Sequence, residues 1–451
     1  MRILIRSLAM GWMSFLAAVS PMTATAADEG PSRPGLVAEV LEGRRHEARA
    51  SWWGFDPDDS TAILQKAIDS KVERLVIDRQ ASPWVTGPLS GVGGQEIVLE
   101  SGVELVALKG AFRGKGECLL TFDHRERVIV RGEKDDAGEP PVIRMRKEDY
   151  QSADYERSEW RHGLAFLGCR DARVENLRIE KTGGDGIYLG TGSDKIPNRD
   201  VVIRGVDCHA NHRQGISVIS AENLLIEDCL LRDTDGTDPQ AGVDFEPNDP
   251  ADVLVNCVAR RCVAVGNAGT GYQLCLQSLA GRSRPVSITL EDCVSRGNAQ
   301  HAVHLVSAPE DPPSGRLRLV RFLAEGDAMA GLSVQFNPCD AIRIDLEDVT
   351  FRDCARHDSF FAPLYLQGTD LAGRPAGNLH FDRVTVKDEV DRPPFFVRGP
   401  KGSRPADVVR DVTGRILLQR DGRERTLEAL DAAEPDRADP AGASSPSSPT
   451  P

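Results

Sequence analysis

The chain has 451 residues, carries a formal net charge of −14 and is 5% aromatic, with 42 glycines. The negative charge disfavours non-specific binding to nucleic acid or an anionic membrane. After the first 26 residues, no segment approaches the roughly 18 apolar residues of a membrane span. Frequent glycines with few aromatic residues favour many short strands joined by turns over a helical protein.

The first 26 residues have the pattern of a secretory signal peptide. Two arginines precede an apolar stretch over residues 8–22, and the small residues of a cleavage site stand at positions 24–26. The apolar stretch is too short and too interrupted for a stable span, and no cysteine follows the cleavage site to carry a lipid. We therefore expect a cleaved signal and an exported protein, periplasmic or secreted, whose mature chain begins at Ala27.

A linker over residues 27–50 is expected before the first regular element, which is an amphipathic helix in FDPDDSTAILQKAIDS. Asp59 or Ser60 is a suitable N-cap for this helix. Four apolar residues are predicted to share one face of it, namely Ala62, Ile63, Ala67 and Ile68.

A repeat follows, in which a glycine, or once an alanine, opens a short alternating strand. The openings are Gly163, Gly186, Gly215, Gly242, Gly271, Ala302 and Gly331. Successive steps between these positions are 23, 29, 27, 29, 31 and 29 residues. Two further strands, PLYLQG near Leu364 and FFVRGP near Phe395, fit additional coils. Self-similarity at this period indicates stacked supersecondary units.

The repeats predict an all-β fold, a right-handed parallel β-helix over residues 51–415. Each unit holds two or three short strands and almost no helical periodicity, which excludes leucine-rich, ankyrin and tetratricopeptide repeats. A propeller is the competing fold, but its blades are longer and antiparallel. A solenoid exposes its core at the first coil, so the preceding helix is expected to cap it. Residues 420–451 are rich in Pro, Ser and Ala and are expected to form a disordered tail.

Two kinds of segment resemble the pectin-lyase-like superfamily of β-helix proteins. DPDDSTAILQKAID is similar to the cap segment of that superfamily, and NLRIEKTGGDGIYLG and VVIRGVDCHANHRQGISVISAENLLIEDC are similar to its coils. The resemblance covers residues 52–398. It implies the fold but does not choose a reaction, because the superfamily contains lyases, hydrolases, epimerases and non-catalytic proteins.

Alignment of the strands on their opening residue predicts which side chains stack between coils. Two apolar files are expected to face the core: Ile187, Ile216, Val243, Tyr272, Val303 and Leu332 in one, and Leu189, Val218, Phe245, Leu274, Leu305 and Val334 in the other. A third file is expected to point outward, and we call it the polar file: Tyr188, Ser217, Asp244, Gln273, His304 and Ser333.

Asp244 and Glu246 stand at alternate positions of this outward face and are the leading candidates for catalysis. Residues i and i+2 of a strand lie about 6.6–7 Å apart at Cα. Because this is a Cα spacing, the carboxyl groups can approach the separation of either retaining glycosidases, about 5–5.5 Å, or inverting ones, about 6.5–9.5 Å, and the spacing does not assign stereochemistry. Two close carboxyls also push their pKa values apart, which suits one acid and one base. An Asp/Glu pair on a polar strand face also occurs without any function.

Neighbouring coils add further candidates. Asp185, Arg213 and His304 are predicted to assist catalysis, with Arg213 holding a substrate carboxylate or neutralising developing charge and His304 transferring a proton. The side chains predicted to bind substrate are Tyr188, Gln214, Gln273, His301 and Gln335.

The carboxylates also form a candidate calcium site, since calcium prefers hard oxygen ligands. Asp238, Asp244 and Glu246 would supply these ligands. The loop that contains Asp238, DTDGTDPQ, has its glycine too early for an EF-hand and is also an ordinary turn sequence. We therefore expect one of two cases: the protein needs no cofactor, or it needs calcium.

A narrower comparison concerns mannuronan C-5 epimerases and related alginate lyases. Asp185-Gly186 resembles their Asp-Gly motif, and Arg213 with Gly215 resembles most of their Arg-His-Gly motif. Their histidine falls on Gln214 here, and Gln cannot exchange protons near neutral pH. His212 or His304 would have to replace it. Polygalacturonases resemble the chain at Asp185, but their following Asp-Asp and Gly-His-Gly elements are absent.

Five cysteines recur at similar places in their coils: Cys208, Cys229, Cys262, Cys293 and Cys354. No CxxC spacing suggests a metal site. Disulfides are compatible with export, but the repeat favours packed thiols in the core. For Trp84 and Trp160, packing in the core or cap is favoured over stacking on a sugar ring.

The sequence therefore predicts an exported monomer that cleaves a polysaccharide, as a glycoside hydrolase or a polysaccharide lyase, in a cleft along the sheet of the glycine-opened strands. A non-catalytic glycan-binding or purely structural β-helix, and a uronan C-5 epimerase, are the alternatives.

Overall fold

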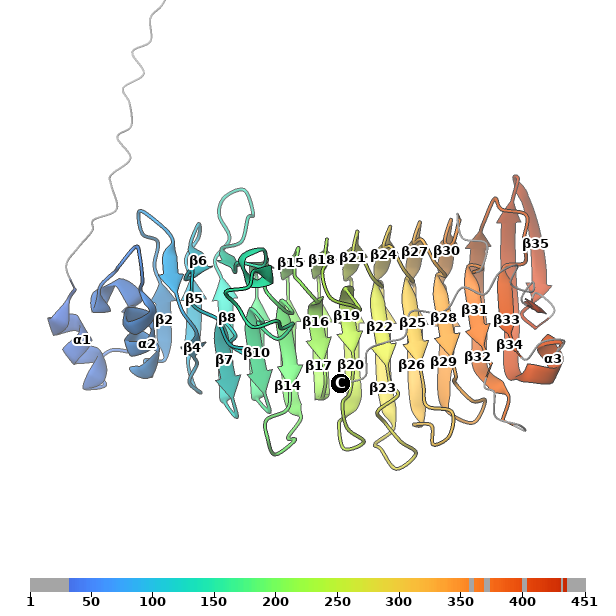
Figure 1. Ribbon diagram of the computed structural model, residues 1–451, viewed down its shortest axis with the longest axis horizontal. Coiled ribbons are helices and arrows are strands. Elements are labelled where there is room, and N and C mark those ends of the chain that lie inside the picture. Colours follow the sequence, from blue (N-terminus) through green and yellow to red (C-terminus); the bar gives the residue numbers. More distant parts are fainter. Residues whose placement is uncertain (1–31, 357–360, 369–373, 400–403, 431–432, 436–451) are drawn as a thin grey trace, which may run out of the picture.

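The chain winds into a long parallel solenoid whose coils follow one another along a single axis (Figure 1). The computed structural model describes residues 32–356, 361–368, 374–399, 404–430 and 433–435. The predicted signal peptide and residues 436–451 of the predicted tail lie outside the described residues. No helix in the part that is described is long and apolar enough to cross a membrane.

The glycine-opened strands form one face of the solenoid, a 12-stranded parallel sheet that we call the front sheet. Its strands are β4 Leu89–Ser90, β7 Leu120–Asp123, β10 Leu164–Leu167, β13 Ile187–Gly190, β16 Gln214–Val218, β19 Ala241–Phe245, β22 Tyr272–Cys275, β25 Val303–Val306, β28 Leu332–Gln335, β31 Leu364–Gln367, β33 Phe395–Arg398 and β36 Ala433–Pro435.

The remaining strands form a second sheet that bends to make two further faces. The longer face contains β1 Glu47–Arg49, β2 Arg74–Ile77, β5 Glu96–Leu99, β8 Glu126–Gly132, β11 Arg170–Glu175, β14 Asn198–Arg204, β17 Ala221–Glu227, β20 Leu254–Arg260, β23 Val286–Glu291, β26 Gly315–Val320, β29 Ile342–Glu347, β32 Ala376–Lys387 and β34 Val409–Arg420. The shorter face contains β3 Trp84–Thr86, β6 Glu104–Ala107, β9 Val142–Arg144, β12 Arg178–Glu180, β15 Asp207–His209, β18 Leu230–Arg232, β21 Val263–Val265, β24 Val294–Arg296, β27 Leu323–Glu325 and β30 Thr350–Arg352.

Close backbone approach explains the glycines that open front-sheet strands such as β16 and β19. A Cβ on Gly215 would lie 2.6 Å from the carbonyl oxygen of Gly242, and a Cβ on Gly242 would lie 2.7 Å from that of Gly271. Both distances are too short for a side chain, so glycine here lets successive coils stack closely.

The two apolar files pair in the predicted register and fill the core. Ile216 pairs with Val243 and Val218 with Phe245, and none of the four side chains is exposed to solvent. All ten cysteines lie in the described part of the chain and are free thiols. The preference for packed thiols over disulfides is therefore confirmed.

Buried asparagines form a second ladder beside the front sheet. The Asn267 side-chain oxygen accepts from the backbone N–H of Thr234 at 3.1 Å, and that of Asn298 accepts from the backbone N–H of Asn267 at 3.0 Å. The Asp327 carboxylate continues the ladder by accepting from the backbone N–H of Asn298 at 3.0 Å. Each side chain thus satisfies a backbone donor of the preceding coil, where the turn breaks the sheet ladder.

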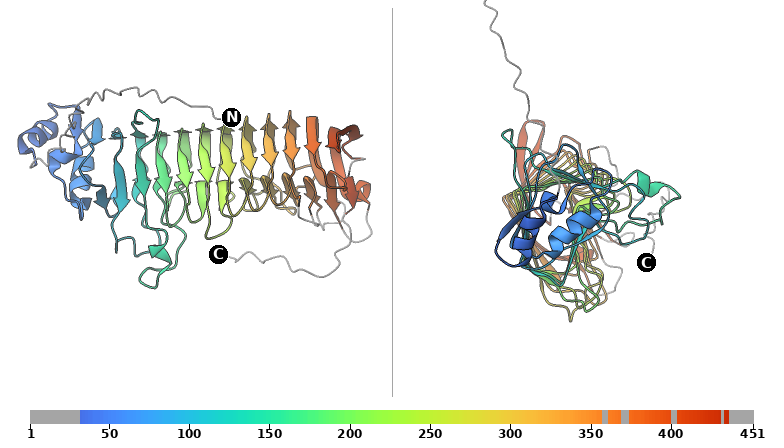
Figure 2. Two further views of the ribbon diagram at one scale, coloured as in Figure 1. Left: turned by 90° about the horizontal axis from the view of Figure 1, so that it is seen from above. Right: turned by 90° about the vertical axis from the view of Figure 1, so that its left-hand side faces the viewer.

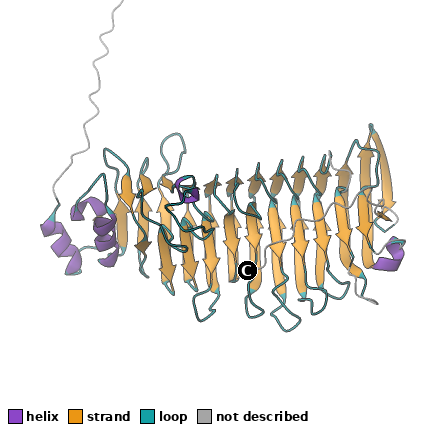
Figure 3. Cartoon of the chain, in the orientation of Figure 1, coloured by secondary structure: helices purple, strands orange, loops and turns teal. Residues whose placement is uncertain are grey.

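Helices lie mainly at the ends of the solenoid (Figure 3). They are α1 Pro34–Leu41, α2 Thr61–Asp69, α3 Pro405–Val408 and the short 3₁₀ turns η1 Ala50–Trp53 and η2 Asp149–Gln151. The predicted helix is α2, which buries Leu64, Ala67 and Ile68, whereas Ala62 is exposed. Viewed along the axis, α1 and α2 cover the first coil (Figure 2).

Both predicted boundaries of the solenoid require correction. The segment 27–50, expected to be a linker, contains α1 and strand β1, which pairs with β2. The expected tail begins later than residue 420, because β35 Arg423–Glu428 pairs antiparallel with β34. Strand pairing at both ends of the solenoid thus extends beyond the repeats.

The asparagine ladder should contribute to stability through buried hydrogen bonds. We predict that Asn298→Ala lowers the free energy of unfolding by about 2–4 kcal/mol, because it leaves buried donors of Asn267 without an acceptor. Urea unfolding followed by circular dichroism measures this change. The exposed Asn248→Ala is the matched control and should change the value by less than about 0.5 kcal/mol. Equal effects of the two variants would contradict the role of the ladder.

Candidate active site on the front sheet

The polar file lies on the outer face of the front sheet, in the register that the alignment predicted. Its successive pairs are Tyr188 with Ser217, Ser217 with Asp244, Asp244 with Gln273, Gln273 with His304 and His304 with Ser333. These side chains point away from the core, yet Ser217, Asp244 and Ser333 have no exposed area. The centre of the file is therefore an enclosed polar region rather than an open strand surface.

Gln214, at the start of β16, connects the two buried carboxyls of this region. Its side-chain nitrogen donates to Asp244 Oδ2 at 2.8 Å, and its backbone N–H donates to Asp185 Oδ1 at 3.1 Å. Its side-chain oxygen accepts from Arg213 at 3.1 Å. Gln214 is fully buried with both polar ends engaged inside the protein. It therefore positions neighbouring residues and has no exposed atom for the substrate contact that we expected.

Arg213 supplies the positive charge among these carboxyls. Its guanidinium contacts Glu246 Oε2 at 2.6 Å and Glu159 Oε1 at 3.6 Å, and it lies 4.0 Å from Asp185 Oδ2. Only 11% of the Arg213 side chain is exposed. Glu246 lies one residue beyond β19, but its backbone N–H still bonds Val218, so its side chain stays on the same face as Asp244.

Burial shifts the pKa values of the two connected carboxyls. Burial raises the pKa of Asp185 to about 7, against the opposing effect of Arg213. Burial and the nearby Glu246 carboxylate raise the pKa of Asp244 well above its usual value, again against Arg213. Burial thus favours the protonated form of both carboxyls, and Arg213 opposes it in each.

His162 also contacts Asp185. The sequence had not suggested a role for this residue. Its ring stacks on Tyr188 with 4.4 Å between centroids, and its Nδ1 accepts the backbone N–H of Asp185 at 2.9 Å. Burial and Arg213 lower the pKa of His162 to about 3, so the ring is neutral. Asp185 Oδ2 lies 3.2 Å from this Nδ1, whose lone pair already accepts the backbone N–H, so the neutral His162 ring donates no hydrogen bond to Asp185.

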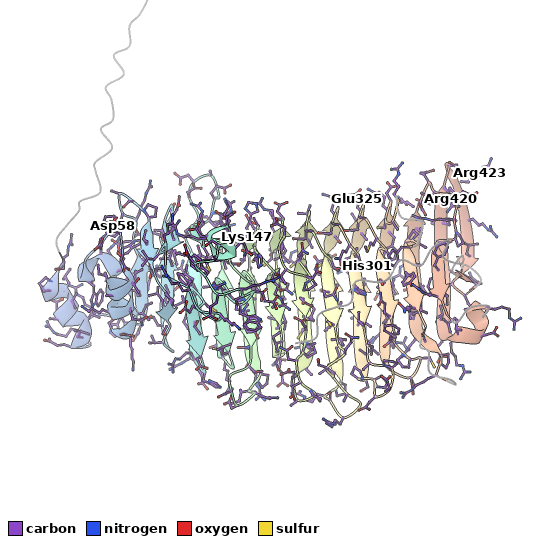
Figure 4. The ribbon with its side chains drawn as sticks, in the orientation of Figure 1. Asp58, Lys147, His301, Glu325, Arg420 and Arg423 are labelled. Carbon is purple, nitrogen blue, oxygen red and sulfur yellow. The ribbon has the colours of Figure 1, made fainter. Side chains whose placement is uncertain are left out.

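A second group lies farther along the polar file. The His304 ring bonds Gln273 at 3.2 Å and packs against His301, which is labelled in Figure 4, with 4.7 Å between centroids. Burial lowers the pKa of His304 to about 4 and that of His301 well below its usual value. Neither ring is poised to exchange protons at neutral pH, which argues against the predicted catalytic role of His304. Gln335 is partly exposed, one coil beyond.

Several buried polar atoms of the site have no hydrogen-bond partner within the described residues. They are Asp185 Oδ2, Arg213 Nε, Ser217 Oγ, Asp244 Oδ1, His301 Nδ1, His304 Nε2 and Ser333 Oγ. An unpaired buried polar atom costs about 1–3 kcal/mol. Their presence on neighbouring coils of the front sheet suits a place where a hydroxyl-rich ligand or water completes the hydrogen bonding.

The candidate calcium site does not assemble. No group of three His, Cys, Asp or Glu side chains able to hold a metal occurs among the residues that the structure describes. Asp238 is exposed in its loop and accepts from Gln240 at 2.6 Å, whereas Asp244 is enclosed and bonded to Gln214. The three predicted oxygen ligands therefore do not form one donor set.

Two surface cavities lie away from the predicted cleft. Cavities of about 360 Å³ beside Leu225 and about 550 Å³ beside Leu417 occur on the other sheet. Neither is lined by a residue of the polar file. The chemistry of its side chains, rather than a cavity, therefore identifies the candidate site.

The segment before β10 borders the site and exposes an aromatic ring. It projects from the side of the solenoid (Figure 2) and includes η2. Arg161 anchors it by donating to backbone oxygens of Phe112 and Glu156, so Arg161 is structural. Trp160 is 51% exposed, which makes the expectation of packing wrong for this residue, whereas Trp84 is buried as expected.

The raised pKa of Asp185 predicts a pH-dependent cost to stability. A carboxyl whose pKa is raised in the folded protein lowers the free energy of unfolding as the pH rises. The loss occurs between the pKa of the unfolded state, about 4, and that of the folded state, about 7. Asp185→Asn should therefore match the parent near pH 4 and be more stable at pH 8, with the difference growing by at most ~1.4 kcal/mol per pH unit.

Chemical denaturation at pH 4, 6 and 8 measures this difference. The exposed Asp136→Asn is the matched control and should show the same offset at every pH. A parent protein at least as stable as Asp185→Asn at pH 8 would contradict the assignment.

Comparisons with known proteins agree with the architecture. A family model described as "Right handed beta helix region" matches residues 156–311. The uncharacterized protein YclG of Bacillus subtilis is 28% identical over 124 residues, covering 25% of this chain and 21% of that protein. The SPbeta prophage-derived uncharacterized protein YorA of Bacillus subtilis is 25% identical over 236 residues, covering 50% of this chain and 34% of that protein. The matches thus span about a fifth and a third of these relatives.

Three solved structures are similar at low sequence identity. The A-module of the mannuronan C-5 epimerase AlgE4 from Azotobacter vinelandii has 16% identity and a TM-score of 0.51, covering 88% of this chain and 99% of that one. The family 28 exopolygalacturonase of Yersinia enterocolitica has 12% identity and a TM-score of 0.52, covering 84% of this chain and 76% of that one. The tailspike protein of Escherichia coli bacteriophage HK620, solved with a pentasaccharide, has 13% identity and a TM-score of 0.53, covering 80% of this chain and 68% of that one.

At these identities the solved structures establish the fold alone. Their parallel coils, the family model and the in-register ladders of this chain describe the same architecture. The protein is a right-handed parallel β-helix.

Proposed function

We propose that this protein is an exported enzyme that hydrolyses a glycosidic bond of a polysaccharide at the polar file of the front sheet. The observation that carries the proposal is the pair of buried carboxyls, Asp185 and Asp244, both with raised pKa and both bonded to Gln214. The similar fold of a mannuronan epimerase and an exopolygalacturonase supports a carbohydrate substrate. Export rests on the signal-peptide pattern of the first 26 residues.

Asp244 is the general acid. Its raised pKa keeps it protonated, and Gln214 occupies Oδ2, so the proton belongs on the unpaired Oδ1. It passes to the oxygen of the leaving sugar as the bond between that oxygen and the anomeric carbon breaks. A carboxyl kept protonated at neutral pH by burial suits this step.

Asp185 is the general base. Its ionised form, which predominates above pH 7, takes a proton from water while the water oxygen bonds to the anomeric carbon. Exchange with solvent then returns both carboxyls to their starting states. Arg213 stabilises the ionised form of Asp185, and Glu246 orients Arg213 through their 2.6 Å contact. This assignment replaces the initial pairing of Asp244 with Glu246.

Elimination and epimerisation are less compatible with the site. Both reactions need a base that removes a carbon-bound proton, and Gln214 stands where the epimerase motif has histidine. His304 is a weak base because burial lowers its pKa to about 4. His212 instead bonds the hydroxyl of Thr237 at 3.0 Å, and burial lowers its pKa as well.

A purely glycan-binding protein is the second candidate, since it would use the same polar file. The file's unpaired hydroxyls and ring nitrogens are compatible with binding alone. Two buried carboxyls with raised pKa values are not needed for that purpose and cost stability, which favours catalysis.

Asp244→Asn and Asp185→Asn should each lower kcat at least ~10²-fold, because each removes one proton-transfer group. Reducing-end release from a panel of polysaccharides measures activity, and ultraviolet absorbance detects unsaturated products in parallel. Asp136→Asn is the matched control and should retain full activity. Full activity in Asp244→Asn would refute the assignment of the acid, and unsaturated products would indicate a lyase.

The pH dependence gives an independent check on the base. We expect kcat/KM to rise with pH through about 7 as Asp185 ionises, and to fall again as Asp244 loses its proton at higher pH. Arg213→Gln should move the lower limb to higher pH, since Arg213 lowers the pKa of Asp185. Arg213→Lys keeps the charge and should leave the limb closer to its original position. A limb unchanged in a folded Arg213→Gln variant would contradict this role.

A further inference from the structure

Negative charge predominates around the proposed catalytic carboxyls. Asp185, Asp244, Glu246 and Glu159 lie around a single guanidinium, that of Arg213. The histidines of the region do not add positive charge, because burial lowers the pKa values of His162, His301 and His304. A substrate carboxylate entering here would meet carboxyl groups without a free cation to offset them.

Each nitrogen of the Arg213 guanidinium faces a polar group of the protein. One terminal nitrogen contacts Glu246 at 2.6 Å and the other donates to the Gln214 side chain at 3.1 Å, while Nε faces Glu159 at 3.6 Å. Arginine binds a uronate carboxylate most strongly through two parallel N–H donors. Freeing them would leave the Glu246 carboxylate, which is only 25% exposed, without its partner. Arg213 is therefore not the substrate-carboxylate clamp that we expected from the sequence.

The unpaired atoms of the site include acceptors that donor groups on a ligand would satisfy. Asp185 Oδ2 is an acceptor without a donor, and Ser217 Oγ and Ser333 Oγ can both accept. Sugar hydroxyls and protonated amines supply donors, whereas a uronate carboxylate supplies only acceptors. Trp160, exposed on the bordering segment next to Glu159, offers an aromatic face on which an uncharged sugar ring can stack.

We propose that the site selects a carboxylate-free glycan, uncharged or carrying protonated amines, and excludes polyuronates. The inference rests on the proposed glycan-hydrolysing function of the same site and adds the class of its substrate. The charge arrangement around Arg213 carries it.

Binding of the protein to chemically matched polymers tests the selectivity. Polygalacturonate and its fully methyl-esterified form share backbone and linkage and differ in charge, and neutral glucans, mannans and xylans and the amine-bearing chitosan complete the panel. Calorimetry and reducing-end release are recorded on the same samples. We expect binding and cleavage among the carboxylate-free polymers, with polygalacturonate bound at least ~10-fold more weakly than its ester, a difference of about 1.4 kcal/mol.

Glu159→Gln provides a variant that should relax the selectivity. It removes the carboxylate facing Arg213 Nε and should raise the affinity for polygalacturonate up to about fivefold, the effect of one partly exposed ion pair. Glu156→Gln makes the same charge change at an exposed position of the same segment and should have no effect. An equal gain in both variants would show that net charge alone is responsible and would overturn the proposal.

The outcomes separate the two claims. Selective binding of carboxylate-free glycans without bond cleavage supports the selectivity and overturns the hydrolase. Cleavage of polygalacturonate in preference to its ester supports the hydrolase and overturns the selectivity. Absence of binding to every polymer of the panel, in a protein that is folded by circular dichroism, overturns both.

Discussion

Across the repeats, each coil hydrogen-bonds in register to the coil that follows it, and the rest of the structure depends on that constraint. Equivalent side chains of successive coils must then stand about 4.8 Å apart along the axis. Apolar side chains satisfy the constraint by packing, as Ile216 and Val243 do. Asparagines satisfy it by hydrogen-bonding to the backbone of the preceding coil, as Asn298 does. Glycine satisfies it at Gly215 by leaving room for the neighbouring carbonyl.

Charged side chains satisfy the same constraint by alternating in sign between coils. On the longer face of the second sheet, Arg204 bonds Glu227 at 2.8 Å, and Glu291 receives Arg260 at 2.8 Å and Arg321 at 2.7 Å. Glu325, labelled in Figure 4, lies between Arg296 and Arg352 on the shorter face. Each exposed pair contributes little by itself. Together they avoid the repulsion that stacked like charges would cause.

The front sheet departs from this alternation, and the departure marks the site. Asp185 and Asp244 come from coils on either side of Gln214, so a neutral amide separates two carboxyls that share one arginine. Their raised pKa values mean that the fold gives up stability at neutral and higher pH to keep them there. Retention of a costly arrangement is typical of catalytic groups, and it is the physical basis for preferring chemistry over passive binding.

The sequence by itself determined the β-helix, the files and the capping helix, because periodic glycines and alternating apolar residues allow one register in a stacked parallel fold. It also identified Asp185, Arg213 and Asp244 as neighbours. It did not reveal that Gln214 bonds both carboxyls, that Glu246 occupies Arg213, or that His162 stacks on Tyr188. Side-chain direction and burial decide these contacts, and both depend on the turns and the bordering segment, whose paths no repeat specifies. Only the tertiary structure therefore decided which carboxyls are enclosed, and with that their protonation.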